Sequence, residues 1–174
     1  THDADLYKGI AEMGWTATTI PEEYGGLGMS HLELVVIAEE LGRACAPVPF
    51  SSTVYLAAEA IMALGTEAQK QAWLPRLADG SAVGCFALGE AGGAVTPDQI
   101  TTSVSGGVIH GTKVPVADGG IADVAVVVCT SDGGDGATLA LVDLGQDAVA
   151  RDNVQMIDFS RGHAEMTFNG ACAE

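Results

Sequence analysis

The sequence predicts an α+β fold, with a helical domain over residues 1–80 followed by an antiparallel β-barrel or sandwich domain over residues 81–174. Near Gly80 the hydrophobic period changes from 3.6, which is typical of helices, to 2, which is typical of strands. The first part carries helix-capping pairs, whereas the second carries short β-branched runs separated by glycines, with no helical pattern between them. Strands that follow one another in this way form antiparallel sheets.

The helical domain begins with a short helix over about residues 5–13, which Gly14 ends, and a loop rich in glycine and proline follows over residues 15–29. Ser30 and Glu33 form a capping box at the start of a helix of about 15 residues. The apolar face of this helix is wide, which predicts that the helix is buried among other helices.

Two more helices are expected before the change of period. One covers about residues 52–64 and ends at Gly65. The next begins at a second capping box, formed by Thr66 and Gln69, and extends to roughly Leu77.

The β domain is expected to contain six strands. Their ranges are 82–88, 100–104, 108–110, 124–129, 138–142 and 164–168. The polar, glycine-rich residues 131–136 predict a hairpin loop between the fourth and fifth strands.

Composition excludes several classes of partner. Seven basic residues against 23 acidic ones give a net charge of −16, which opposes binding to a nucleic-acid backbone. The chain does not start with a basic segment followed by an apolar one, and no stretch reaches the ~18 apolar residues of a membrane span. We therefore expect a soluble cytoplasmic protein that binds neither nucleic acid nor membrane.

The cysteines and histidines predict neither a disulfide framework nor a metal site. Cys45, Cys85, Cys129 and Cys172 are far apart and form no C-x-x-C pair, and no two histidines have the i, i+4 spacing. Reduced thiols and no bound metal are expected.

Standard catalytic motifs do not fit this sequence. Residues 106–113 read G-G-V-I-H-G-T-K, which places Thr before Lys and lacks the strand-to-helix context of a phosphate loop. A dinucleotide-binding site requires a strand before its glycines, and the glycines at 25–28 do not follow one. No G-x-S-x-G elbow occurs. Glu90 stands out because it follows an apolar strand and precedes Ala-Gly-Gly-Ala, where a backbone can approach a ligand closely. The residues alone leave open whether Glu90 is a solvated turn acid or part of a ligand loop.

Several segments, in the same order, resemble the acyl-CoA dehydrogenase family. They are G-W at 14–15 with I-P-E-E-Y-G-G-L-G at 20–28, E-E-L-G-R at 39–43, G-T-E-A-Q-K-Q-A-W-L-P-R-L-A-D-G at 65–80, F-A-L-G-E at 86–90 and G-G-I-A-D at 119–123. The resemblance extends over nearly the whole chain, from about Leu6 to Glu174.

The resemblance implies a helical N-terminal domain, a β-barrel middle domain and a C-terminal helical bundle, with FAD between the last two and an acyl-CoA thioester beside its ring. In this family a carboxylate removes the α proton while a hydride leaves the β carbon. The last residues, 168–174, resemble the close of the middle domain, so we expect the bundle and its glutamate base outside this chain and assign no catalytic residue within it. Electron-transfer flavoprotein or another acceptor is the implied redox partner.

Carried over residue by residue, the resemblance implies flavin-binding positions and one substrate-binding position. The flavin positions are Phe86, Leu88, Gly89, Val116 and Ala117. The substrate position is Val95, in the loop that meets the cofactor phosphates or the CoA arm in the family.

Several positions depart from the family pattern. Ala94, Val95 and Thr96 align with the Gly-Ser-Asp that ends this loop in the family. Gly89 replaces a threonine beside the flavin, Ala91 a proline, Pro115 the tryptophan that shields the flavin, and Ala117 a hydroxyl aimed near flavin N5. The main-chain N–H groups of Gly89 and Ala117 remain as donors, whereas Pro115 has none.

Three functions therefore stay open. The first is an active FAD-dependent acyl-CoA dehydrogenase of fatty acid or sterol side-chain metabolism, with its base supplied by residues outside this chain. The second is a non-catalytic subunit that pairs with an active homologue in a heteromeric enzyme. The third is a flavin-dependent oxidase or monooxygenase of the same superfamily. In each case, strongly apolar helices predict association, as a homo-oligomer or as a heteromer with a related subunit.

Overall fold

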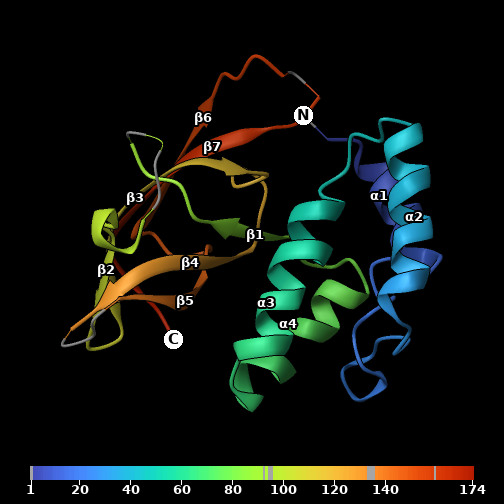
Figure 1. The fold of residues 1–174 in the computed structure, drawn as a ribbon, viewed down its shortest axis with the longest axis horizontal. Helices are drawn as coiled ribbons and strands as arrows, with labels where there is room; N and C mark the ends of the chain where they lie inside the picture. The colour runs from blue at the N-terminus through green and yellow to red at the C-terminus, as the bar shows by residue number, and fades with distance from the viewer. Residues whose placement is uncertain (1, 92, 94–95, 133–135, 159) are drawn as a thin grey trace. The chain divides into compact units, whose positions relative to one another are not determined.

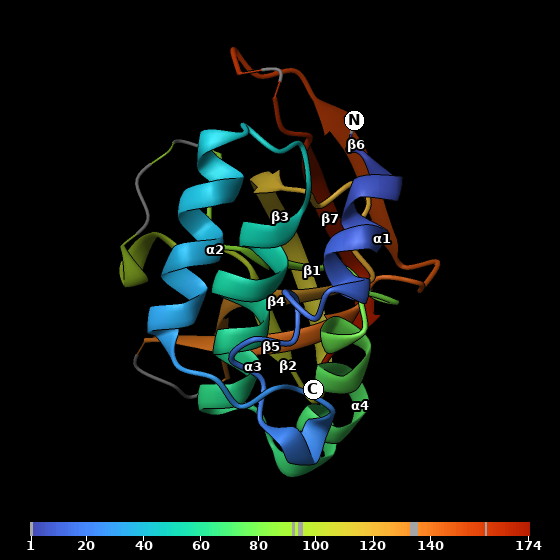
Figure 2. The same ribbon diagram turned by 90° about the vertical axis from the view of Figure 1, so that its right-hand side faces the viewer.

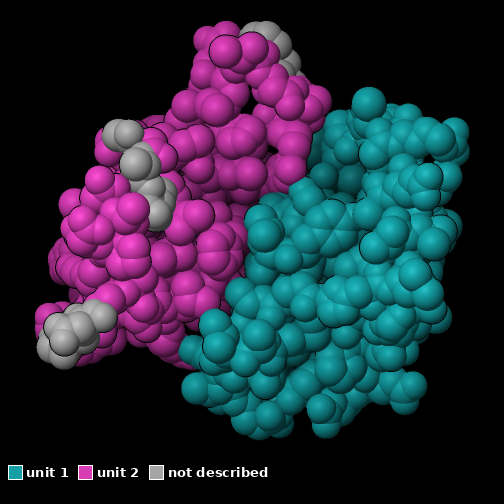
Figure 3. Space-filling model, in the orientation of Figure 1, with its two compact units in different colours: residues 1–84 teal, residues 85–174 magenta. Residues whose placement is uncertain are grey.

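The chain divides into two units, Thr1–Gly84 and Cys85–Glu174, which are coloured separately in Figure 3. The computed structural model describes residues 2–91, 93, 96–132, 136–158 and 160–174 (Figure 1). Helices occupy the first unit and a seven-stranded sheet the second, to which β1 contributes across the boundary, so the α+β fold class is confirmed.

Unit 1 contains the predicted helices, which Figure 2 shows from the side. They are α1 (Ala4–Glu12), α2 (His31–Arg43), a π-helical segment η2 (Ser51–Ala58) that continues into α3 (Glu59–Leu64), and α4 (Glu67–Ala78). A short 3-10 turn, η1 (Glu22–Tyr24), lies in the loop between α1 and α2. No helix among the described residues is long and apolar enough to cross a membrane.

Both predicted capping boxes are confirmed. At α2 the Ser30 N–H donates to Glu33 Oε2 at 2.9 Å, and the Leu32 N–H donates to Ser30 Oγ at 3.2 Å. At α4 the Thr66 N–H donates to Gln69 Oε1 at 2.8 Å, and the Gln69 N–H donates back to Thr66 Oγ1 at 3.3 Å. These bonds satisfy N–H groups of the first turn that have no partner inside the helix.

The prediction that α2 is buried among other helices was wrong. Of its residues only Leu34 is buried, whereas Leu32, Val35 and Val36 are 72%, 60% and 60% exposed. The prediction failed because the core of unit 1 covers only part of the apolar face of α2. The core cluster that includes Leu34 consists of Tyr7, Ile10, Leu34, Val48, Phe50 and Val54.

The glycine-rich loop after α1 is tightly packed at one position. A Cβ on Gly26 would lie 1.8 Å from the Ile20 carbonyl oxygen, so only glycine fits there. The Tyr24 hydroxyl lies 2.9 Å from both carboxylate oxygens of Glu67 at the start of α4, which anchors the loop to that helix.

Unit 2 is a curled sheet whose strand order is β1-β4-β2-β3-β7-β6, with β5 paired to β4. The strands are β1 (Gly84–Ala87), β2 (Ser103–Ser105), β3 (Val108–Ala117), β4 (Val124–Ser131), β5 (Ala137–Asp143), β6 (Val149–Val154) and β7 (His163–Cys172). The pairs β2–β3, β3–β7, β4–β5 and β6–β7 are antiparallel, and the short β2–β4 pair is parallel. The predicted hairpin loop at 131–136 joins β4 to β5, and its residues 133–135 lie outside the described chain.

The sheet differs most from the sequence prediction in three strands. β7 continues to Cys172, whereas its predicted strand ended at Phe168. β3 continues to Ala117, past a register shift between Lys113 and Val116, whereas its predicted strand ended at His110. β6 was not predicted, because V-A-R-D-N-V has no apolar alternation and its residues are partly or fully exposed. A strand at the edge of a sheet has one neighbour and needs no apolar pattern on both faces.

The core of unit 2 contains a charged side chain among apolar ones. Ile109 and Val116 of β3, residues 124–129 of β4 and Phe168 of β7 supply buried apolar side chains. Lys113 of β3 is also fully buried. A buried lysine needs a partner for its charge, and this partner leads to the candidate site.

Candidate functional site

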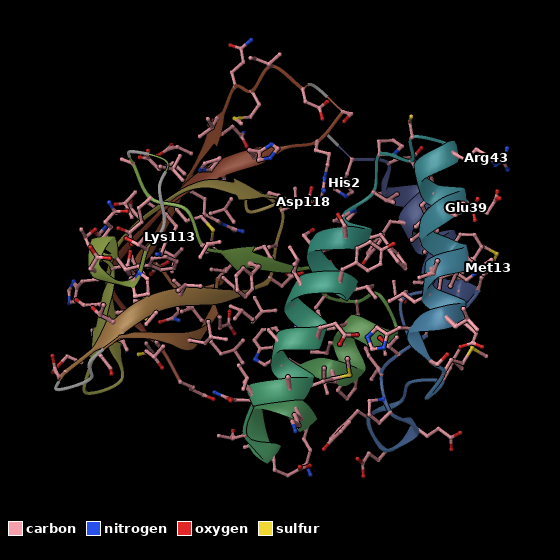
Figure 4. All side chains as sticks on the ribbon, in the orientation of Figure 1. His2, Met13, Glu39, Arg43, Lys113 and Asp118 are labelled. Carbon is pink, nitrogen blue, oxygen red and sulfur yellow. The ribbon has the colours of Figure 1, made fainter. Side chains whose placement is uncertain are left out.

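The candidate site lies where the chain leaves β1 and passes β3. The Val114 N–H donates to Gly89 O at 2.8 Å, which joins the two segments. From β3 the Lys113 side chain, labelled in Figure 4, donates to Leu88 O at 3.2 Å and to Glu90 Oε1 at 2.7 Å. The buried lysine thus holds the chain on both sides of Gly89.

The Glu90 carboxylate is bound on both of its oxygens. Thr101 donates its N–H and its hydroxyl to Oε2 at 2.9 and 2.6 Å, and the Thr102 N–H donates to Oε1 at 3.0 Å. Burial favours the neutral carboxyl, but hydrogen bonds from Lys113, Thr101 and Thr102 outweigh it and hold the Glu90 pKa well below its usual range. Glu90 is therefore neither a solvated turn acid nor suited to act as a base near pH 7.

The predicted flavin positions differ in what they present to a ligand. Phe86 is half-buried on β1, and Leu88 is 43% exposed just after it. Gly89 and Ala117 are partly exposed, whereas the Val116 side chain is fully buried. The predicted substrate position, Val95, lies outside the described residues.

Gly89 and Ala117 both present main-chain N–H groups. Among the described residues none accepts a hydrogen bond from Gly89 N–H. The Asp118 N–H donates to Gly162 O at 2.8 Å, so Ala117 and His163 face each other as a non-hydrogen-bonded pair. The Ala117 N–H consequently points away from β7, on a side where no described strand pairs with β3 at this position.

Gly89 is also closely packed. A Cβ at this position would lie 3.0 Å from Val114 O, closer than ordinary van der Waals contact. The glycine therefore permits the approach of β1 to β3 that its carbonyl bond to Val114 requires.

A second buried ion pair closes the turn after β3. Asp118, labelled in Figure 4, is 5% exposed and bonds Arg161 Nη2 through Oδ2 at 2.6 Å. The Asp118 backbone has a positive φ of 57°, and its carbonyl accepts from Ile121 and Ala122 N–H at 3.0 and 3.1 Å. These bonds stabilise a turn.

Other parts of the molecule offer weaker candidates. No group of three or more metal-ligating side chains occurs within the described residues. An open hollow beside the start of α1 is lined by His2, Asp3, Ala4, Asp5 and Pro47. Asp3 already accepts the Leu6 N–H at 2.9 Å as the helix cap, so we assign this hollow no function.

Sequence reasoning missed the groups that organise the site. Lys113 was noted only as part of a motif, and Thr101 was placed in a strand without a role. The sequence did contain a signal for a buried lysine. Ile109 and Lys113 are an even number of residues apart, so they lie on the same face of β3. A lysine on the same face as a buried isoleucine needs an anionic partner. Nothing local in the sequence identifies Glu90, 23 residues earlier, as that partner.

Comparisons with known proteins agree on one family. The model of the acyl-CoA dehydrogenase N-terminal domain matches residues 1–81. Acryloyl-CoA reductase (NADH) of Anaerotignum propionicum is 36% identical over 136 residues, which are 74% of this chain and 34% of that protein. Human mitochondrial short-chain specific acyl-CoA dehydrogenase is 34% identical over 133 residues, 72% of this chain and 32% of that protein.

Solved structures give the same result for the fold. Butyryl-CoA dehydrogenase of Megasphaera elsdenii superposes with a TM-score of 0.89 at 25% identity, over 99% of this chain and 49% of that chain. The ChsE4–ChsE5 complex of Mycobacterium tuberculosis gives a TM-score of 0.85 at 29% identity, over 98% of this chain and 46% of that chain. The chain thus spans about a third of the length of the curated relatives and about half of the solved chains.

Proposed function

Because the chain belongs to the acyl-CoA dehydrogenase family, we propose that it supplies one wall of a flavin site for FAD-dependent α,β-dehydrogenation of an acyl-CoA thioester. The protein would then be an oxidoreductase acting on CH–CH groups, with electron-transfer flavoprotein or another carrier as acceptor. The single observation that carries this proposal is the pair of main-chain donors at Gly89 and Ala117, for which no acceptor is found among the described residues.

The residues around Gly89 fit a planar heteroaromatic ring. Ala117 follows Val114, which bonds Gly89, by three residues along β3, across a register shift between Lys113 and Val116. Two N–H donors on neighbouring segments suit a fused ring system, which has several acceptors. Phe86 and Leu88 supply apolar surface next to it, and Gly89 adds no Cβ between ring and backbone.

The residues of this chain would bind and orient rather than transfer protons. Bound FAD supplies the acceptor for the hydride that leaves the substrate β carbon. Gly89 and Ala117 would donate to ring acceptors, and Leu88 would exclude water from one side. Glu90 stays ionised and bound to Lys113, so the base that removes the α proton must come from elsewhere.

An assay of turnover tests this function. The full-length protein is supplied with FAD, a panel of short-chain, long-chain and sterol-type acyl-CoA thioesters, and an artificial electron acceptor. Reduction of the acceptor that requires both FAD and thioester supports the proposal. Folded protein that binds FAD yet turns over no thioester, alone or with any copurifying chain, would contradict it.

A second function is favoured by specific substitutions. Ala117 and Pro115 provide no hydroxyl and no indole at positions where the family usually has them, and the neighbour from Mycobacterium tuberculosis is described as a two-component complex. We infer from these features that a non-catalytic subunit of a heteromeric acyl-CoA dehydrogenase is the alternative. A related chain that copurifies in stoichiometric amount, and that alone retains FAD, would favour this alternative over the first.

A further inference from the structure

Lys113 lies next to the proposed site without forming part of its surface, since its side chain is fully buried. Its ammonium group has two acceptors in the described chain, the carbonyl of Leu88 at 3.2 Å and the carboxylate of Glu90 at 2.7 Å. These acceptors flank Gly89. One buried cation therefore fixes the chain immediately before and immediately after the glycine.

We propose that Lys113 is a positioning residue that turns the Gly89 N–H outward, as a main-chain donor for an oxygen or nitrogen acceptor of a heteroaromatic ligand. The Leu88–Gly89 peptide is trans, and in a trans peptide the C=O and N–H point in opposite directions. Because Leu88 O accepts from a buried ammonium, the N–H of the same peptide points away from the interior. The inference rests on the proposed function, since bound flavin would supply the acceptor.

Glu90 has a different part in this arrangement. Its carboxylate also accepts from Thr101 and from the Thr102 N–H, so it is an anchor that holds the ammonium in place. The Gly89 carbonyl is fixed independently by the Val114 N–H. The carbonyls of Leu88 and Gly89 are therefore both hydrogen-bonded. The Leu88–Gly89 peptide cannot rotate without breaking the hydrogen bond from Lys113 to Leu88 O.

Flavin titrations of four variants separate positioning from mere structural support. The variants of the full-length protein are Lys113→Met, Glu90→Gln, the double variant Glu90→Gln/Lys113→Met, and Lys8→Met as a control on the exposed face of α1. FAD affinity is measured by flavin fluorescence, and stability by urea unfolding of the same samples.

If Lys113 has a positioning role, the affinity for FAD and the stability against urea should change independently of each other. Glu90→Gln keeps a side-chain oxygen that can accept from Lys113, and so keeps the bond from Lys113 to Leu88 O; FAD affinity therefore falls less than in the double variant, although stability falls. The double variant leaves no unpaired buried charge and regains stability, but it loses the donor to Leu88 O and binds FAD about tenfold more weakly. A double variant that is stable and binds FAD as wild type does would overturn the inference.

A second measurement needs no flavin, so it judges the inference even if the wild-type protein binds none and the proposed function fails. In ligand-free wild type, the Gly89 amide exchanges with solvent rapidly and the Val114 amide is protected. In the double variant the protection of Val114 falls by about tenfold, because the Gly89 segment is no longer held. A protected Gly89 amide in wild type, or unchanged protection of Val114 in the stable double variant, would refute the orientation proposed here.

Discussion

The Lys113–Glu90 pair is the residue-scale feature with the largest expected effect on stability. Lys113→Met removes one partner and leaves the Glu90 carboxylate, only 11% exposed, without its cation. Breaking a buried pair in this way costs about 3–5 kcal/mol of unfolding free energy. Urea unfolding should show such a loss for Lys113→Met and a smaller one for the double variant Glu90→Gln/Lys113→Met. Equal losses in the two variants would mean that the uncompensated charge is not the cause.

Acid should weaken the contribution of Glu90 to the unfolding free energy. Its pKa is lowered in the folded state from 4.5, so its stabilising effect is complete above pH 4.5 and is lost as the pH falls toward the folded pKa. The difference in unfolding free energy between wild type and Glu90→Gln should therefore be constant near neutral pH and shrink in acid. Denaturant titrations at several pH values measure this difference, and one that grows in acid would contradict the assigned direction.

At the scale of elements, the capping box of α4 should contribute measurably to stability. Thr66→Ala removes the acceptor for the Gln69 N–H and should cost about 1 kcal/mol of unfolding free energy. Gln71→Ala is the control in the same helix, because this exposed side chain bonds Glu67 on the surface of the helix. Its expected change is within about 0.5 kcal/mol. A Thr66→Ala loss no larger than that of the control would show that the cap contributes little.

The elements that the sequence predicted well are those with local signals. Ser30 with Glu33, and Thr66 with Gln69, each form a box within one turn, so spacing alone located the starts of α2 and α4. β6 lacked such a signal, because an exposed edge strand requires only a partner, β7, that lies far away in the sequence.

The site was predictable only in part for the same reason. The resemblance identified Gly89 as a position of interest, and its placement beside Val114 is a fact of the fold. The ion pair between Lys113 and Glu90 joins two segments that are separate in the sequence. These segments meet because of the register of the sheet, which no single segment specifies. The assignment of Phe86, Leu88, Val116 and Ala117 to flavin stays a prediction.

At the scale of the whole molecule, the uncovered face of α2 predicts association with another polypeptide or another part of the protein. Leu32, Val35 and Val36 lie together on this helix and are largely exposed. Val35→Glu should therefore reduce association in solution, because it places a charge in an apolar contact. Ile157→Glu introduces the same charge at an apolar side chain that is 99% exposed in the other unit, and it serves as the control. Sedimentation velocity that shows identical behaviour for both variants and wild type would argue against an interface at α2.

The central claim is that this chain forms a wall of a flavin site through main-chain donors rather than side-chain hydroxyls. Titration of the purified full-length protein with FAD, followed by the visible absorption of the flavin, tests it most directly. We expect saturable binding with a shifted and better resolved flavin band, retained when the hydroxyl of Thr112, which bonds Thr167 within the sheet, is removed by Thr112→Val. Folded protein that leaves the flavin spectrum unchanged at saturating FAD, both alone and together with any copurifying related chain, would contradict the claim.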